Sequence, residues 1–375
     1  LRMKSLHMGI LVMPVIVVFW RSLGLSITQI FVLQAIFAVV VASLELPSGY
    51  LADWLGRRTV MAAGYAFFSA GMLTQGCSSG FWGLVLGETL MGVGSSMVSG
   101  ADTSILFDTL KSVGREREFA RQQGRMVFAT QIAEGSAALL GGLLGTIHLR
   151  LPFFLYGGQL LLAAATALWI LEPKRETFGA DASHGENLRL VFRHLRKTPE
   201  LARYLVLFSY LAACSLTAVW LYQPHWQVLE IPLVWFGPLW GCVNFAVAFA
   251  ARGGAVLRER LGLRAALWTA AVLPGLGFLG LGLVKHWPAI AFALCIQTMR
   301  GFNSTLVVDE INRRTGSEMR ATVNSIGAGG MRLVFCTVGL ALGVAADRYG
   351  LPAAFLAAAA VFGGGALALR RTLRA

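Results

Sequence analysis

Long apolar stretches recur along the whole chain and constrain the fold more than any other feature. A helix needs about 20 residues to cross the hydrocarbon core of a bilayer. Twelve stretches approach or reach that length: 5–20, 27–47, 59–77, 82–106, 123–147, 151–171, 202–222, 232–255, 265–284, 288–308, 321–346 and 351–369. Only 14% of the residues are charged, whereas a soluble domain is about a quarter charged. The sequence predicts an all-α polytopic membrane protein with twelve transmembrane helices.

The basic residues are distributed unequally between the two sides of the predicted membrane. The terminal segments and every second connector hold 25 of the 32 Lys and Arg residues, and the opposite connectors hold four. Lys and Arg gather on the cytoplasmic side of inner-membrane proteins. We therefore expect both termini in the cytoplasm of a bacterium. The net charge of +13 is explained by this topology, so we predict no nucleic-acid partner.

The longest polar connector, 172–201, divides the chain into two halves. We expect an N-terminal six-helix bundle over 1–171, a cytoplasmic linker over 172–201 and a C-terminal six-helix bundle over 202–375. The halves also resemble each other weakly, with Pro152 and Pro352 each beginning the last helix of a half. Internal repeats of this kind are common in secondary transporters.

A short charged segment, 49–58, lies between the second and third apolar stretches and reads GYLADWLGRR. The pattern G-x-L-A-D-x-x-G-R-R, at this place after the second span, closely resembles the signature loop of the major facilitator superfamily. The resemblance implies a twelve-helix secondary transporter with two pseudo-symmetric six-helix bundles that work by alternating access. Gly49 and Gly56 are expected to permit tight turns.

In this superfamily the loop carboxylate contacts the cytoplasmic start of helix 11, which here lies near Arg320–Thr322. By that resemblance, Asp53 latches the two halves together, and Arg57 or another arginine completes the contact. A helix start suits a carboxylate because its free N–H groups and dipole favour negative charge. Arg58 is as well explained by topology alone.

Four charged residues fall at membrane depth: Glu88, Glu134, Arg300 and Arg332. A charge at mid-helix costs about 2.5–3.5 kcal/mol, so each should be paired, hydrated or neutralised. We predict that they couple protons or substrate and that some acid–base contacts cross between the halves; a static buried pair is the alternative. Glu88 stands where many superfamily members carry an arginine. Glu45 and Asp309, near cytoplasmic helix ends, are weaker candidates with structural or gating roles.

Several polar and aromatic side chains could contact a substrate: Asn244, Asn303, Gln34 and Trp240. Trp220, Tyr222, Trp226 and Trp235 fall near helix ends, and we expect most of them in the membrane–water interface, where Trp and Tyr are enriched.

Several functions are not supported by any pattern in the chain. There is no GxxxxGK[ST] nucleotide loop, and the histidines and five cysteines form no catalytic or metal-binding cluster. We therefore predict no enzyme activity and no cofactor. The predicted function is secondary transport of a small organic solute, coupled to protons, by a monomer in the bacterial inner membrane. Efflux of drug-like compounds or metabolites is favoured; uptake of an anionic metabolite and a non-transporting receptor or assembly factor remain alternatives.

Overall fold

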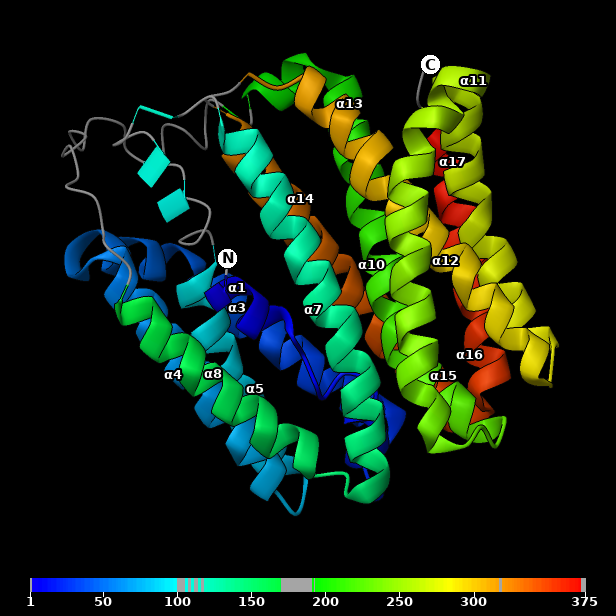
Figure 1. Ribbon diagram of the computed structural model, residues 1–375. Helices are drawn as coiled ribbons and strands as arrows, with labels where there is room; N and C mark the ends of the chain where they lie inside the picture. The colour runs from blue at the N-terminus through cyan, green and yellow to red at the C-terminus, as the bar shows by residue number, and fades with distance from the viewer. Residues whose placement is uncertain are drawn as a thin grey trace. The chain divides into compact units, whose positions relative to one another are not determined.

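The computed structural model describes residues 2–99, 118–169, 193–316 and 319–371, together with 105–106, 109–110, 114–115 and 191. Within these residues every regular element is a helix (Figure 1). The chain divides into two compact units. The first holds residues 1–177 and 232–241, and the second holds residues 178–231 and 242–375.

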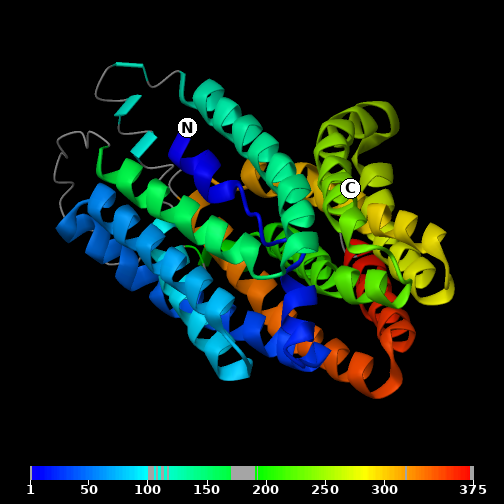
Figure 2. The same cartoon turned by 60° about the horizontal axis from the view of Figure 1, so that its bottom comes forward.

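The first unit packs its helices through small residues. It contains α1 (Arg2–Met8), α2 (Ile16–Ser22), α3 (Ile27–Leu55), α4 (Arg57–Cys77), α5 (Phe81–Val98), α7 (Phe119–Ile147), α8 (Leu151–Leu168) and η2 (Leu233–Trp235). The helices α5 and α8 both lie beside α4 (Figures 1 and 2). A Cβ added at Gly71 of α4 would lie 2.6 Å from the carbonyl oxygen of Gly87 in α5. Such close backbone approach drives helix association in lipid, where apolar side chains gain nothing by leaving the solvent.

The second unit contains the remaining described helices. They are α10 (Pro199–Val228), α11 (Phe236–Leu283, whose first turns belong to the first unit), η3 (Trp287–Ala289), α12 (Ile290–Phe302), η4 (Asn303–Val307), α13 (Val308–Arg313), α14 (Arg320–Val334), η5 (Phe335–Gly339), α15 (Leu340–Tyr349), α16 (Leu351–Ala358), η6 (Ala359–Gly363) and α17 (Gly364–Arg371). The elements η4, η5 and η6 are π-helical turns. They interrupt the last three predicted spans, and the apolar pattern of the sequence gives no sign of them.

Every predicted span coincides with helical structure in the described part of the chain. Eight segments of that part are long and apolar enough to cross a membrane. The other four predicted spans correspond to α1 with α2, to α4, to α7, and to α12 with η4.

The predicted polar turn over 49–58 is wrong in its extent, because α3 continues to Leu55 and α4 begins at Arg57. Only Gly56 leaves the helical conformation, with φ +88°, a region that glycine occupies without a steric penalty. Gly49 is helical and needs no such freedom. The same device recurs inside α11 at Gly262, with φ +80°, where one helix ends and the next begins.

The first predicted span is also not continuous. Its helix stops at Met8 and resumes at Ile16. Gln159 of α8 donates hydrogen bonds to the carbonyl oxygens of Leu6 (2.5 Å) and Gly9 (2.9 Å), and Tyr156 donates one to that of His7 (2.6 Å). Non-helical backbone at membrane depth persists only where protein or water satisfies it, and here α8 supplies the donors.

Candidate functional site

Glu88 lies at the centre of a buried polar cluster in the first unit. It sits in the third turn of α5 and is 1% exposed. Trp20 of α2 donates its indole N–H to Gln75 Oε1 of α4 at 3.0 Å, and Gln75 Nε2 donates in turn to Glu88 Oε1 at 3.0 Å. The side chain of Gln34, from α3, also faces the carboxyl group. Three helices, α2, α3 and α4, therefore bring neutral groups toward one acid on a fourth.

The Glu88 carboxyl group has no ion-pair partner among the described residues, and its Oε2 atom accepts no hydrogen bond there. A buried charge without a counter-charge is expensive, and such groups give up their charge by binding or losing a proton. The prediction that Glu88 is paired, hydrated or neutralised stays a prediction, and the described residues offer it no counter-charge. Its predicted role in coupling remains a prediction.

A second polar cluster lies in the second unit, between α10 and α12. Gln297 Nε2 donates to the Tyr222 hydroxyl at 3.1 Å, and that hydroxyl donates to the Ala293 carbonyl oxygen at 3.4 Å. The rings of Tyr222 and Trp226 stack, with their centroids 6.2 Å apart. Gln297 is buried, and its Oε1 atom receives no donor among the described residues. Gln297 was not among the predicted site residues, although a single amide side chain in an apolar run could have indicated it.

The expectation of an interfacial aromatic belt is wrong for most of its members. Trp220, Tyr222 and Trp226 are buried inside the second unit, and only Trp235 is exposed. The same apolar sequence is compatible with a helix end at the membrane surface and with a packed protein interior. Only tertiary contacts decide between these two positions.

Arg300 and Asn303 follow Gln297 along α12 and η4. Arg300 is exposed, and no hydrogen bond or ion pair to it is found in the described chain. Asn303 is buried and donates its amide to the Phe208 carbonyl oxygen at 3.1 Å, while its Oδ1 atom receives no donor there. Arg300 therefore differs from Glu88: the acid is enclosed and the base is open.

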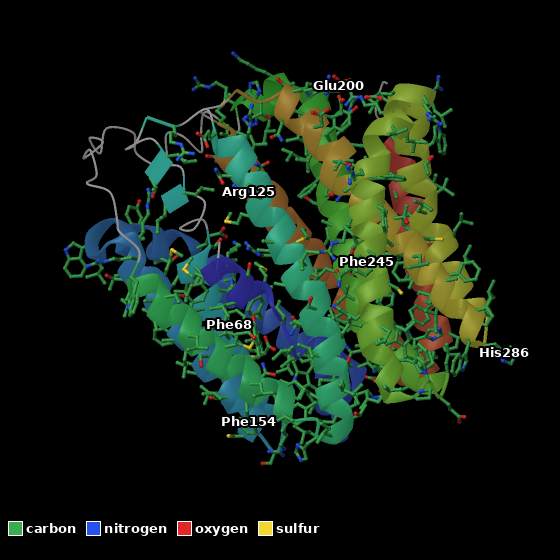
Figure 3. All side chains as sticks on the ribbon, viewed as in Figure 1. Phe68, Arg125, Phe154, Glu200, Phe245 and His286 are labelled. Atoms are coloured by element: carbon green, nitrogen blue, oxygen red, sulfur yellow. The ribbon has the colours of Figure 1, made fainter. Side chains whose placement is uncertain are left out.

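A network of ion pairs joins α10, α11 and α13 at one end of the second unit. Arg258 contacts Asp309 Oδ2 and Glu310 Oε1, each at 2.6 Å. Arg314 pairs with Glu310 and, at 3.4 Å, with Glu200. Figure 3 shows Glu200 at this end of the unit and His286 at the other. Asp309 thus belongs to this network, and its predicted structural or gating role stays a prediction.

Burial disfavours the charge on Arg314, but the hydrogen bond and the charge of Glu310 outweigh burial, so the pKa of this guanidinium lies above its usual value. The guanidinium also lies over the Tyr204 ring, 4.7 Å from its centroid. The sequence analysis did not single out Glu310 or Arg314, although their spacing of four residues is typical of a helical ion pair.

The other predicted residues are scattered through the two units. In the first unit Gln34 is buried and Glu45 and Glu134 are partly buried; in the second, Arg332 is partly buried. Trp240 is buried and Asn244 is partly buried in α11. Arg57 and Arg58 open α4, and the side chain of Asp53 lies outside the described residues. The predicted latch and the predicted contacts between the halves therefore stay predictions.

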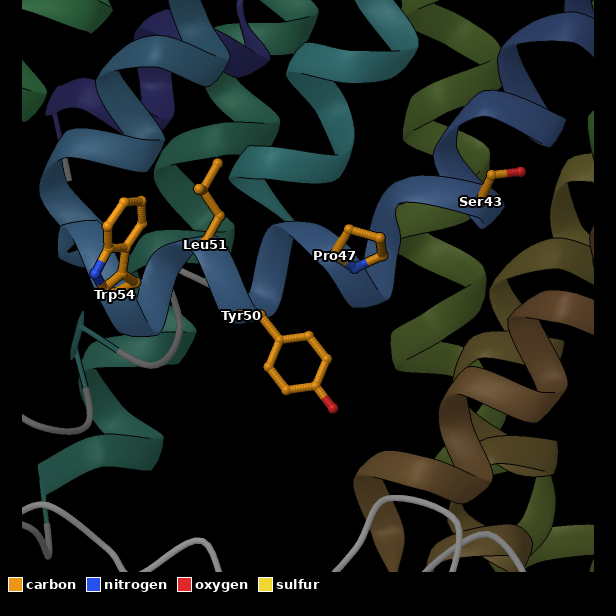
Figure 4. Close-up of a pocket in the computed structure, with 5 residues that line it drawn as sticks. All are labelled: Ser43, Pro47, Tyr50, Leu51 and Trp54. Carbon is orange, nitrogen blue, oxygen red and sulfur yellow. The ribbon is translucent and has the colours of Figure 1, made fainter.

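An open groove of about 730 Å³ follows one side of α3 (Figure 4). It is lined by Ser43, Pro47, Tyr50, Leu51 and Trp54. None of the buried polar groups described above reaches it, so the groove is not the candidate site.

Comparison with known proteins places the chain in a family. The sequence model described as Major Facilitator Superfamily matches residues 6–337. The chain belongs to this superfamily. Its members are non-enzymatic carriers.

Two curated relatives resemble part of the chain. The inner membrane transport protein YajR of Escherichia coli K12 is 31% identical over 121 residues, which are 32% of this chain and 26% of YajR. The quinolone resistance protein NorA of Staphylococcus aureus is 26% identical over 168 residues, which are 44% of this chain and 42% of NorA. The chain thus matches less than half the length of either relative.

Solved structures share the fold over nearly the whole chain. A mutant of the nucleoside transporter NupG gives a TM-score of 0.82 at 11% identity and covers 99% of this chain and 98% of NupG. A bacterial homologue of the human lysosomal transporter Spinster, in an inward-facing and unoccupied conformation, gives 0.75 at 16% identity and covers 98% and 94% of the two chains. The all-α membrane fold predicted from the sequence is confirmed.

Proposed function

We propose that this transporter expels a small organic solute from the bacterial cytoplasm in exchange for protons, by alternating access, with Glu88 as the proton-binding group. The observation that carries the proposal is the enclosure of the Glu88 carboxyl group, which is 1% exposed and has one oxygen without a donor among the described residues. We also propose that both termini lie in the cytoplasm, because the basic residues are concentrated in the connectors on that side.

The polar cluster gives Glu88 two protonation states of different cost. With a proton, the acid is neutral and suits its enclosed position. Without one, the charge costs about 2.5–3.5 kcal/mol at membrane depth, and the amide of Gln75, held by Trp20, offsets part of this cost. A difference of this size shifts a two-state equilibrium by about a hundredfold, which is sufficient to couple protonation to a change of conformation.

We also propose a direction of transport. NorA is a quinolone resistance protein, and the candidate side chains lie in mostly apolar surroundings, which favours efflux of a drug-like compound. The NupG structures are of a nucleoside transporter. Uptake of an anionic metabolite is the second candidate function, and the exposed base Arg300 is the observation that favours it.

The test is a flux assay in proteoliposomes that hold a pH-sensitive dye. Norfloxacin, a quinolone, and uridine, a nucleoside, are the first solutes added, followed by a wider panel. We expect a solute-driven pH change with the wild type. With Glu88→Gln we expect that change to disappear while solute exchange without a proton gradient continues, because a glutamine keeps the shape and loses the titratable proton.

Glu230→Gln is the matched control, since Glu230 is an exposed acid after α10 and should leave the pH change intact. A Glu88→Gln variant that still moves protons with solute would refute the role of Glu88. Binding of solutes without any flux would favour a receptor or assembly factor instead.

A further inference from the structure

Arg300 occupies the middle of its membrane span. It lies ten residues after the start of α12 at Ile290 and nine residues before Asp309. With a rise of 1.5 Å per residue, it is about 15 Å from Ile290 and about 13.5 Å from Asp309. A guanidinium at this depth is therefore far from both aqueous surfaces.

The arginines of the ion-pair network in this unit are neutralised by acids. Arg258 and Arg314 each contact two carboxylates at the end of the unit. Arg300 is exposed, and the described chain offers it no acid. Arg252 is also exposed, but it lies six residues from Arg258, about 9 Å along the helix, and a long side chain can reach the surface from there. Arg300 cannot reach it.

Exposure of an unpaired guanidinium to lipid would cost about 2.5–3.5 kcal/mol or more. Arginines at this depth instead face a water-filled cavity and mark the pathway of a substrate or an ion. The exposed face of Arg300 is therefore open to water and to any solute that enters.

The surroundings of Arg300 supply unused acceptors. Three residues before it, Gln297 keeps Oε1 without a donor and is 1% exposed; three residues after it, Asn303 keeps Oδ1 without a donor and is 3% exposed. Residues three apart are neighbours on a helix. Asn303 also begins the π-helical turn η4, and such turns are frequent at functional sites. Both amide oxygens are buried, so of these three side chains only Arg300 is open to a solute.

We infer that Arg300 binds the carboxylate of the transported solute. This inference rests on the proposed transport function and names its substrate class, an organic carboxylate. A guanidinium matches a carboxylate with two parallel hydrogen bonds. The single positive charge suits a solute with a single negative charge.

The test is a thermal-shift titration of the purified protein in detergent with acid and amide pairs of the same shape. The pairs are salicylate with salicylamide, 4-hydroxybenzoate with 4-hydroxybenzamide, and nicotinate with nicotinamide, supplemented by norfloxacin. A ligand that binds the folded state raises the melting temperature. We expect at least one acid to do so and its amide to bind about tenfold more weakly or not at all, because it lacks the charge-assisted pair.

The variants separate recognition from folding. Arg300→Gln should melt like the wild type without ligand and lose the response to the acid, and Arg300→Lys should keep the charge and bind more weakly, since the fork is lost. Arg348→Gln, at an exposed arginine near the end of α15, should respond like the wild type. If Arg300→Gln melts at a lower temperature than the wild type, Arg300→Lys is used instead. A ratio of acid affinity to amide affinity below that of the wild type supports the inference, and an unchanged ratio overturns it.

The inference is overturned if no acid of the panel binds, if each amide binds as well as its acid, or if Arg300→Gln keeps the wild-type affinity. This failure is distinct from failure of transport. Proton flux driven only by neutral or cationic solutes would support the proposed function and refute the inference that the substrate is a carboxylate. Binding of a carboxylate without any flux would support the carboxylate site and refute the proposed transport function.

Discussion

Replacing Arg258 by methionine removes a side chain that joins α11 to two acids of α13. Methionine keeps the aliphatic length and leaves out the guanidinium. Two contacts of 2.6 Å are lost, one to Asp309 and one to Glu310. The second matters more, because the Glu310 side chain is only 4% exposed and cannot replace the lost partner with water.

The expected loss of stability depends on the contacts that Glu310 keeps. Removing one partner of a fully buried ion pair costs about 3–5 kcal/mol. The Arg258 side chain is 24% exposed, and Glu310 keeps its contact with Arg314, so we expect a smaller loss of about 1–2 kcal/mol. For a unit of this size, each kcal/mol lowers the melting temperature by about 2–4 °C, which gives a decrease of about 2–8 °C.

The assay is thermal unfolding in detergent, with Arg313→Met as the matched control. Arg313 also contacts Asp309, at 2.8 Å, but its side chain is 62% exposed, and an exposed pair contributes about 0–1 kcal/mol. Arg313→Met should therefore lower the melting temperature by at most about 4 °C, and by less than Arg258→Met does. Equal losses for both variants, or no loss for Arg258→Met, would refute the argument that burial of the acid sets the strength of the network.

Two further predictions concern the interrupted first span. Gln159→Leu should leave carbonyl groups of that span without donors and cost about 1–2 kcal/mol, seen as faster hydrogen exchange over residues 9–15; Thr166→Val, which loses only a bond within its own helix, should not change this exchange. Gly141→Ala should destabilise by about 1–3 kcal/mol, because its Cβ would clash with a backbone carbonyl of the same span, whereas Gly158→Ala meets open space and should be neutral or stabilising in thermal unfolding.

The positions of the charges could be predicted from the sequence, but not their surroundings. Glu88 and Arg300 are equally conspicuous in the sequence as charges in apolar runs. The structure encloses one and exposes the other. Enclosure depends on which neighbouring helices converge. Gln75 contacts Glu88 from 13 residues away along the chain, and Trp20, 68 residues from Glu88, holds Gln75. No local pattern carries that information.

What the sequence determined by itself is the number and order of the spans, because twenty consecutive apolar residues have one stable place, the bilayer. It also determined the family, because the pattern around Asp53 and Gly56 is specific. Only the tertiary structure decided that the first span is unwound, that the polar segment is almost wholly helical, and that Tyr222 and Trp226 are buried. In each of these cases partners distant in the chain supply the hydrogen bonds or the packing, and apolar periodicity does not depend on them.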